Sequence, residues 1–433
     1  MMDEGGVPSI YEHKSQMEMR VNAMDGPPAE ALGETASVHP LRAKYFRRFW
    51  IGATISLFGD QFYLVALPWL VLQLTGSGLA LGTILMVAAI PRAVFMLIGG
   101  AASDRISPRR VMIATGIART ILVAAVAGLI YLHLLRLWHL YLLAGAFGFA
   151  DAFSYPAAMA LLPSLVSLDR LPAANALFGG SAQLSTTVGP APAGWTVKRW
   201  GVAAAFAIDA VSFLFVIAAL LMIPDPPATP AARRPSMGKA ILEGLRYVAQ
   251  DPPMRALVLM IAAMNFGVAG PLVIGLAAIG KQRFRSAAVF GILLSAMAGG
   301  GLVGTFLPAI FRRQRHRGLL LLGFSFAVGV GMAAIGFLHH VAAIAAVLAL
   351  VGLGSGLVGV HLQAWFQARV ERALLGRVLS VLMFAAVGLI PFSYVMAGAL
   401  IQVNLTLMFV VSAAILLVVT AFAALNPTVR AID

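Results

Sequence analysis

The sequence has no cysteine and little charge. Charged residues make up 11% of its 433 residues, whereas 60% are hydrophobic and the mean hydropathy is +0.90. Soluble domains hold about 25% charged residues, so a chain of this composition could not cover a water-exposed surface without large apolar patches. A soluble globular protein is therefore excluded. The absence of cysteine also excludes disulfides, thiolate metal sites and a cysteine nucleophile.

Other missing features restrict the function. The sequence has no glycine-rich phosphate loop and no histidine cluster with metal-ligand spacing, and its acids are too few for a dedicated metal site. We therefore expect no enzymatic activity, no metal and no cofactor. A formal net charge of +14 would suggest nucleic-acid binding in a soluble chain. In a membrane protein Lys and Arg accumulate in cytoplasmic loops instead, so we expect no nucleic-acid partner.

Long apolar stretches follow one another from Phe46 onward. Each is about 20 to 29 residues long, close to the roughly 20 residues that a helix needs to cross the hydrocarbon core of a membrane. The sequence predicts twelve spans, at residues 46–74, 79–101, 111–133, 138–165, 173–197, 202–223, 256–280, 286–311, 318–338, 341–366, 378–401 and 405–425. This pattern predicts an all-α integral membrane protein.

The remaining segments divide the chain. Residues 1–40 hold seven acids against two bases and have no long apolar run, so we interpret them as a disordered cytoplasmic tail. The longest connection separates two bundles, and its middle, residues 238–250, predicts an amphipathic helix on the cytoplasmic face; a solvated linker is the alternative. The expected parts are a tail at 1–40, bundles at 41–223 and 256–425, a linker at 224–255 and a second tail at 426–433.

Lys and Arg are unevenly divided between the two sets of connections. The connections on the side of both termini hold 21 of these residues, and the alternate set holds 6. Positive residues remain on the cytoplasmic side of a membrane. We therefore expect a multi-pass protein of the plasma membrane with both termini in the cytoplasm.

The second six spans repeat features of the first six at an offset of roughly 200 residues. The pairs are Pro68 with Pro271, Gly100 with Gly304, Asp169 with Glu371, and Pro190 with Pro391. The repeat predicts two pseudo-symmetric six-helix bundles. Parallel six-helix halves hold a substrate site at their interface near the middle of the membrane, which favours alternating access over a channel.

The connection between the second and third spans carries a motif. It begins at Gly100 and reads Gly-Ala-Ala-Ser-Asp-Arg-Ile-Ser-Pro-Arg-Arg. It resembles the G-x-L-a-D-R-x-G-R-R signature of the major facilitator superfamily, with Gly100, Asp104 and Arg105 matching. The resemblance implies a gating latch in which Asp104, Arg105 and Arg109 pair with the other half when the transporter opens outward. The alternative is that Ser103 or Asp104 caps a helix and the arginines only mark the cytoplasmic side.

Two further stretches resemble exporters of this superfamily. Gly189, Pro190 and Gly194 lie in a Gly-Pro-Ala-Pro-Ala-Gly sequence that is similar to the G-P-x-x-G-G element of its exporters, which implies a gating role. Close helix packing with a bend is the alternative. The stretch from Gly59 to Ser77 resembles the exporter branch that includes the enterobactin exporter and related drug efflux proteins. The arginine motif of many drug antiporters has no counterpart in the fourth span.

Five ionisable residues lie well inside the predicted spans, namely Asp60, Arg92, Arg119, Asp151 and Asp209. Each isolated charge would cost roughly 2.5–3.5 kcal/mol there. At about 1.5 Å per residue, Asp60 and Asp151 lie roughly 21 Å from the cytoplasmic ends of their helices, and Arg92 and Arg119 lie at about 12–14 Å. An arginine side chain spans this gap, so we expect the two acids and two bases to pair. For Arg119 and Asp209, fixing helix register is the alternative role.

The expected proton-coupling residues are Asp60 and Asp151, with Arg92 and Arg119 as their partners. The first and fourth helices line the central cavity in the superfamily that this chain resembles. A carboxylate in such a cavity can exchange a proton, and its charge state can bias the inward–outward equilibrium. No charge recurs at the corresponding positions of the second half, where Asn265 is the candidate substrate-binding residue together with Asp60.

The sequence therefore predicts a secondary active exporter of small amphipathic molecules, such as drug-like compounds or siderophore-type metabolites, that exchanges them for protons. The alternatives are an importer, a lipid-related transporter of the same fold and a non-transporting membrane sensor. The expected partners are the substrate, protons and the bilayer. A twelve-helix chain needs no second subunit, so we expect a monomer.

Overall fold

The computed structural model describes residues 39–105, 107–225, 237–310, 317–370 and 372–430, and within these ranges every regular element is a helix. The predicted N-terminal tail, residues 1–40, lies almost wholly outside the described residues. The first half contains α2 (Lys44–Thr75), α3 (Gly78–Arg105), α4 (Pro108–Tyr131), α5 (Leu137–Leu165), α6 (Leu171–Val188), α7 (Pro190–Trp200) and α8 (Val202–Leu221). Two short helices, η2 (Pro40–Arg42) and η3 (Leu168–Arg170), precede α2 and α6.

The second half begins after a connecting helix, α9 (Met237–Gln250). Its first span is α10 (Pro252–Gly270), continued by η4 (Pro271–Gly275), α11 (Leu276–Ala278) and η5 (Ile279–Arg283). The others are α12 (Ala287–Ile310), α13 (Arg317–Phe337), α14 (Val341–Arg369), α15 (Arg372–Val387), α16 (Ile390–Val403), α17 (Leu405–Leu425) and the short α18 (Pro427–Arg430). The segments η4 and η5 are π-helical, with Pro271 starting the first.

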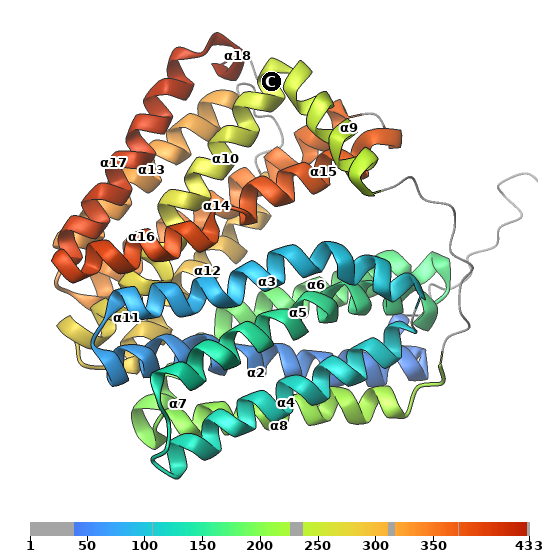
Figure 1. Cartoon of the computed structure of the whole chain (residues 1–433). Helices are drawn as coiled ribbons and strands as arrows, with labels where there is room; N and C mark the ends of the chain where they lie inside the picture. Colours follow the sequence, from blue (N-terminus) through green and yellow to red (C-terminus); the bar gives the residue numbers. More distant parts are fainter. Residues whose placement is uncertain (1–38, 106, 226–236, 311–316, 371, 431–433) are drawn as a thin grey trace, which may run out of the picture.

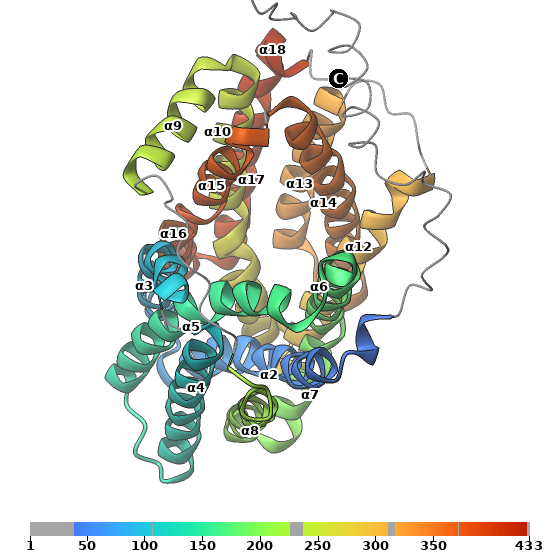
Figure 2. The same ribbon diagram turned by 90° about the vertical axis from the view of Figure 1, so that its right-hand side faces the viewer.

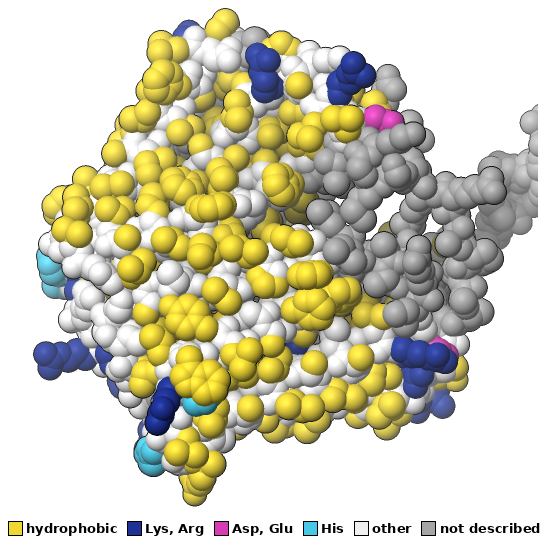
Figure 3. Space-filling view, viewed as in Figure 1, with side chains coloured by type: hydrophobic (Ala, Val, Ile, Leu, Met, Phe, Trp, Pro, Cys, Tyr) yellow, Lys and Arg dark blue, Asp and Glu magenta, His cyan; other side chains and the backbone are white. Residues whose placement is uncertain are grey.

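Ten helical stretches of the described chain are long and apolar enough to cross a membrane. The two other predicted spans are helical as well but are less apolar or shorter. Helix α5 includes Trp138, His139 and Asp151, which lower its hydropathy, and the fifth span is divided into α6 and α7 at Pro190. Hydrophobic side chains cover the middle of the molecule, and Lys and Arg gather near the helix ends (Figure 3).

The two halves lie side by side (Figure 1). Helices α2 to α8 form one group and α10 to α17 the other, and several of the first-half helices are seen end-on in Figure 2. Short connections, including those at Gly76, Gly201 and Asn404, gather at one end of the molecule, which we call the hairpin end. The opposite end, where α8 ends and α9 begins, is called the linker end.

Close contacts between the halves lie toward the hairpin end. Helix α3 packs on α16, and α7 packs on α12. At the first contact, a Cβ atom on Gly82 would lie 2.4 Å from the carbonyl oxygen of Tyr394, so glycine lets the two backbones touch. Gln402 Nε2 donates a hydrogen bond to Ser77 Oγ at 2.7 Å across the same interface. The halves are therefore joined by direct backbone packing at this end.

The second contact between the halves involves two of the predicted gating residues. A Cβ atom on Gly194 of α7 would lie 2.4 Å from the carbonyl oxygen of Ala287 in α12. Beside it, the Ala191 amide donates to Ser295 Oγ at 3.1 Å. Pro190 begins α7 and Gly189 ends α6, so the fifth span breaks where the sequence predicts a bend. The symmetry-related eleventh span also breaks, between α15 and α16, next to Pro391.

The connecting helix α9 packs on α15 and α10 at the linker end. Val248 is buried in this contact, whereas Leu242 and Leu245 are exposed. The helix covers the stretch 238–250 for which the sequence predicts an amphipathic helix. Asp251 caps the N-terminus of α10 by accepting from the Met254 amide at 3.4 Å.

Candidate functional site

Four of the five predicted intramembrane charges form a continuous chain of ion pairs. Arg119 Nη2 of α4 lies 2.5 Å from Asp60 Oδ1 of α2, and its Nη1 lies 3.8 Å from Asp151 Oδ1 of α5. Arg92 Nε of α3 lies 3.1 Å from Asp151 Oδ2. The packing of α3 and α4 on α5 brings these side chains together, so Arg119 joins two carboxylates that are far apart in the sequence.

Aromatic rings enclose Arg119. Its guanidinium carbon lies 4.3 Å from the centre of the Phe213 ring and 4.7 Å from that of Phe147, and the residue is only 8% exposed. Tyr63 stacks on Phe147 at 4.3 Å between ring centres. A desolvated cation over an aromatic face is stabilised by about 2 kcal/mol. The rings therefore hold Arg119 in place and keep water from its pairs, which strengthens them. Its Nε atom has no hydrogen-bond partner.

The three residues paired with Arg119 or Asp151 are more exposed to solvent than Arg119 itself. The Arg92 side chain is 57% exposed, and those of Asp60 and Asp151 are 30% and 19% exposed. Arg119 is thus the sealed centre of the cluster, and Asp60 is the most exposed of its acids. This gradient of exposure lets Asp60 exchange a proton more readily than a fully buried acid could.

Asp209 of α8 is the fifth ionisable residue. The sequence alone did not reveal how deeply its side chain is buried or which groups it faces. It is 0% exposed, and neither carboxyl oxygen has a hydrogen-bond partner. The sequence placed it inside the sixth span, but only the packing of α8 on α2 and α4 shows that it faces the cluster rather than lipid. In the described residues, no three His, Asp or Glu side chains are grouped so as to hold a metal ion.

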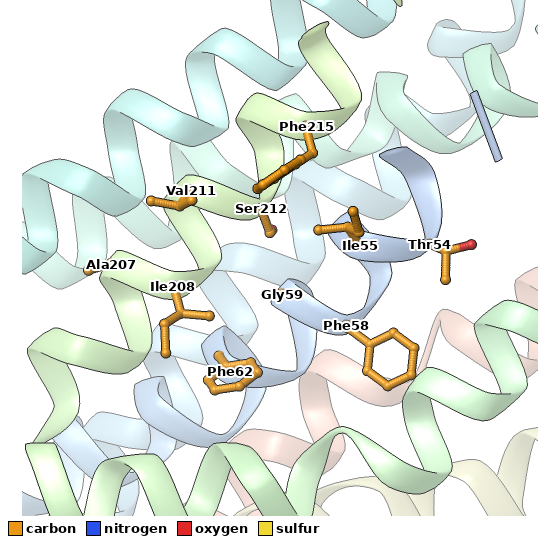
Figure 4. A pocket seen from close by; sticks show the side chains of 10 residues that line it. All are labelled: Thr54, Ile55, Phe58, Gly59, Phe62, Ala207, Ile208, Val211, Ser212 and Phe215. Carbon is orange, nitrogen blue, oxygen red and sulfur yellow. The ribbon is translucent and has the colours of Figure 1, made fainter. Parts of the chain in front are cut away.

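An apolar cavity of about 500 Å³ lies between α2 and α8 (Figure 4). The side chains around it are Thr54, Ile55, Phe58, Gly59, Phe62, Ala207, Ile208, Val211, Ser212 and Phe215. Gly59 lies between this cavity and Asp209, since a Cβ atom on Gly59 would be 3.1 Å from Asp209 Oδ1. The cavity therefore lies against one side of the charge cluster, within the first half.

The residues of the predicted latch lie at the linker end. Gly100, Asp104 and Arg105 belong to the last turns of α3, and their side chains lie outside the described residues. Since α3 continues to Arg105, the alternative in which Ser103 or Asp104 caps a helix is wrong. The N-cap of the next helix is Ser107, whose side chain makes no capping bond.

Arg109 and its neighbours bind the end of α8 instead of the other half. Arg109 Nε donates to the carbonyl oxygen of Leu220 at 2.7 Å. Arg110 Nε lies 2.7 Å from Asp225 Oδ2, and the Ser107 hydroxyl donates to the same carboxylate. The Ser107 hydroxyl and Arg110 hold the pKa of Asp225 below its ordinary value. In this conformation Arg109 therefore stabilises the first half from within.

The remaining predicted site residues lie in helix contacts. Gly189 lies against α2, where a Cβ atom would be 2.5 Å from Gln61 Cγ. Asn265, the candidate substrate-binding residue, is partly exposed on α10, and its Nδ2 donates to the carbonyl of Ile261 one turn earlier at 2.9 Å. Within the described chain, no hydrogen bond joins Asn265 to Asp60. The structure thus does not bring the two candidate substrate residues together.

Two packed groups of membrane helices, close backbone contact at one end and a paired charge cluster inside one group are features of an alternating-access transporter. The sequence of residues 35–433 matches the family of transmembrane secretion effectors, and the chain belongs to this exporter family of the major facilitator superfamily. It is a multi-pass membrane transporter and not an enzyme, and the predicted superfamily and exporter branch are confirmed.

Characterised relatives of similar length agree with this assignment. The multidrug efflux pump Tap of Mycolicibacterium fortuitum is 28% identical over 79% of this chain and 85% of its own. The enterobactin exporter EntS of Citrobacter koseri is 26% identical over 78% and 80%. A crystal structure of a bacterial homologue of the iron transporter ferroportin in an inward-facing state has a TM-score of 0.68 at 17% identity, covering 88% of this chain and 98% of that one. This last likeness establishes the fold alone.

Proposed function

We propose that this protein exports small amphipathic molecules from the cell in exchange for protons, through the cell membrane and as a monomer. The observation that carries the proposal is the ion pair between buried Arg119 and partly exposed Asp60. Protonation of Asp60 removes one charge of this pair, which changes the electrostatic energy of packing α2 against α4. A conformational equilibrium that depends on this packing then depends on protons.

The distribution of basic residues supports an assignment of the described conformation. Of the Lys and Arg in the predicted connections, 21 lie on the linker side and 6 on the hairpin side, which favours a cytoplasmic linker end. The halves are packed together toward the hairpin end. On this orientation, the described conformation is closed toward the outside and corresponds to the inward-facing state that would take up substrate from the cytoplasm.

The substrate class is supported by the character of the available surfaces. The cavity between α2 and α8 has no charged residue in its lining. Three of its lining residues are aromatic, namely Phe58, Phe62 and Phe215. Apolar pockets with few polar groups suit amphipathic ligands. One relative is named as a multidrug efflux pump and another as an enterobactin exporter, which supports export of small molecules by this chain as well.

An importer is the second candidate because the direction of transport depends on coupling and not on fold. Purified protein in liposomes, loaded with a fluorescent cationic amphiphile and given a proton gradient of either sign, separates the two. We expect the amphiphile to move against the proton flow. Movement in the same direction as protons would identify an importer, and movement unaffected by the gradient would contradict proton coupling.

A further inference from the structure

The charge cluster has one more acid than it has bases. Arg92 and Arg119 lie among three carboxyl groups, those of Asp60, Asp151 and Asp209. A net charge in a dry protein interior is unfavourable, so the cluster is most stable when one of the three carboxyl groups is neutral. Asp60 and Asp151 are each within ion-pair distance of a guanidinium. Asp209 is the acid without such a partner.

Asp209 is sealed from solvent on all sides. It is 0% exposed, and neither of its oxygens has a hydrogen-bond partner among the described residues, although an ionised carboxylate needs several. The charged and titratable groups that face it are Asp60 and Tyr63 on α2 and Arg119 on α4. On α7, the third helix packed against α8, the charged residues lie in the last turn at the hairpin end. Arg119 is thus the cation near Asp209.

Arg119 contacts both α2, through Asp60, and α8, through the ring of Phe213. Its guanidinium lies over the ring of Phe213, which follows Asp209 by one turn of α8. Asp209 Oδ1 in turn lies against Gly59, the residue before Asp60. One guanidinium NH group of Arg119, at Nε, has no acceptor. A change of the Arg119 side-chain rotamer would turn its guanidinium from α2 toward α8.

We propose that Asp209 stores a proton in the described conformation and serves as the alternate counterion of Arg119 when Asp60 becomes protonated. The proposal deepens the proposed function, on which it rests, by adding a proton-storing residue on α8 to the cluster. Asp60, which is partly exposed, is then the acid through which protons enter and leave, and Asp209 is the acid that keeps the cluster neutral.

The exchange conserves protons and charge. The O–H bond of Asp209 breaks and an O–H bond forms at Asp60, either directly or through a water molecule. The ion pair of Arg119 passes from Asp60 to Asp209, and the guanidinium stays protonated throughout. Release of this proton from Asp60 to water leaves three ionised carboxylates, so the cluster must bind a further proton before it is neutral again. The cluster has two positive and two negative charges before and after the exchange.

Infrared spectroscopy of the protein in lipid tests the stored proton without requiring transport. At mildly alkaline pH, where exposed acids are ionised, the wild type should show the C=O band of one protonated carboxyl group. Asp209→Asn should abolish this band, and Asp60→Asn should abolish it as well, because Arg119 then requires ionised Asp209. Ser325→Ala, which changes a buried polar side chain of α13 in the second half, should leave the band unchanged.

Three infrared results would overturn the proposal: no such band in the wild type, a band that survives in Asp209→Asn, or a band that survives in Asp60→Asn. The last result would mean that Asp209 stays neutral and never replaces Asp60 as the counterion. Because these spectra need no substrate, they remain decisive even if the wild type proves not to be proton-driven, which would refute the proposed function alone.

Transport then tests the role of the stored proton. In liposomes, Asp209→Asn should keep substrate binding and lose gradient-driven transport by about tenfold or more, since a permanently neutral side chain cannot receive Arg119. Ser325→Ala should retain both activities. A wild type that is driven by protons, together with an equally driven Asp209→Asn variant, would overturn the role of Asp209 and leave proton coupling through Asp60 intact.

Discussion

The two halves of this transporter share an architecture but not a chemistry. The first half holds a cluster of five ionisable residues between α2, α3, α4, α5 and α8, of which Arg119 and Asp209 are buried. At the positions 203 residues later, the counterparts of Asp60, Arg92 and Asp151 are Ala263, Ser295 and Gly354. The second half is instead joined by hydroxyl groups, for example Ser393, whose Oγ donates to the carbonyl of Phe266 at 2.5 Å and accepts from the amide of Gly270.

This difference teaches that the repeat preserves helix packing, which both halves need, and leaves the interior polar groups free to diverge. The second half still contains a buried arginine contact, but at the hairpin end. Arg283 donates to the carbonyls of Leu338 at 2.6 Å and Gly336 at 2.5 Å, so it caps the end of α13. A cation that binds helix-terminal carbonyls stabilises the helix.

The largest expected effect on transport comes from removing the charge of Asp60, because the corresponding position of the second half has no charge. Asp60→Asn should reduce proton-driven transport to the background of empty liposomes, because the Arg119 pair no longer responds to pH. The matched control is Ala263→Asn, at the corresponding position of α10, which should transport normally. Fluorescent-substrate efflux under an imposed gradient measures both. Normal coupled transport by Asp60→Asn would remove the proton role of this residue.

Arg119→Leu tests the difference between the charged first half and the uncharged second half by its effect on thermal stability. Its counterpart in the second half is Leu322, which is buried without any charge. Removing Arg119 leaves Asp60 without its cation, and breaking a buried pair in this way costs about 3–5 kcal/mol. We expect a large loss of thermal stability in detergent. The double variant Arg119→Leu/Asp60→Asn should regain most of it while remaining uncoupled, and an equally unstable double variant would show that packing, not charge, explains the loss.

The contact between the halves at the hairpin end gives a smaller expected effect. A Cβ atom in Gly82→Ala would meet the carbonyl oxygen of Tyr394 at 2.4 Å, so the variant should favour the conformation in which this end is open. Overpacking of about 1–3 kcal/mol corresponds to a population shift of roughly 5- to 150-fold. Gly128→Ala, which would meet no atom within 4 Å, is the control.

The lack of native cysteine makes this prediction measurable. Ala287 is 1% exposed in the contact of α12 with α7, on the other side of the interface from Gly82. With Ala287→Cys as the single thiol, a membrane-impermeant maleimide should react faster in the Gly82→Ala background than in the Gly128→Ala background. Equal rates in the two backgrounds would mean that the α3–α16 contact does not keep the hairpin end closed.

Sequence patterns could predict the helices because length and hydropathy are local properties. The last span, predicted at 405–425, is α17 (Leu405–Leu425), and the amphipathic stretch 238–250 lies in α9. The pairing of two acids with two arginines follows from their depth in the membrane. Depth does not tell which way a side chain points around its helix, so the sequence could not show that Arg119 reaches both acids or that Asp209 lacks a partner.

The sequence could not predict the contacts between residues of different loops either. Ser107 and Arg110 bind Asp225, which is 115 residues after Arg110, and Arg109 binds the carbonyl of Leu220. The motif around these residues suggested a latch to the other half. Which partner an exposed arginine takes depends on the conformation of both halves and on the packing of α4 against α8, which no local pattern encodes.

The smallest expected effect concerns the linker end, where the two halves are alike. Arg110 pairs with Asp225 at the start of the linker, and Arg369 pairs with Asp251 just after α9, at 2.7 Å in both cases. The pKa of Asp225 is lowered from 3.8 by the Ser107 hydroxyl and Arg110, so its contribution to stability is present above pH 3.8 and is lost as the pH falls through the lowered value.

Asp225→Asn should therefore lower the melting temperature at neutral pH by no more than about 2 °C, since exposed ion pairs contribute little. The difference from the wild type should fade as the pH falls from 3.8 through the lowered pKa of Asp225, below which both proteins carry a neutral side chain at this position. Ser107→Ala, which removes the hydroxyl donor but keeps the arginine, should give part of the effect with the same pH dependence. A difference that persists in acid would mean that Asp225 stabilises the first half through packing and not through its charge.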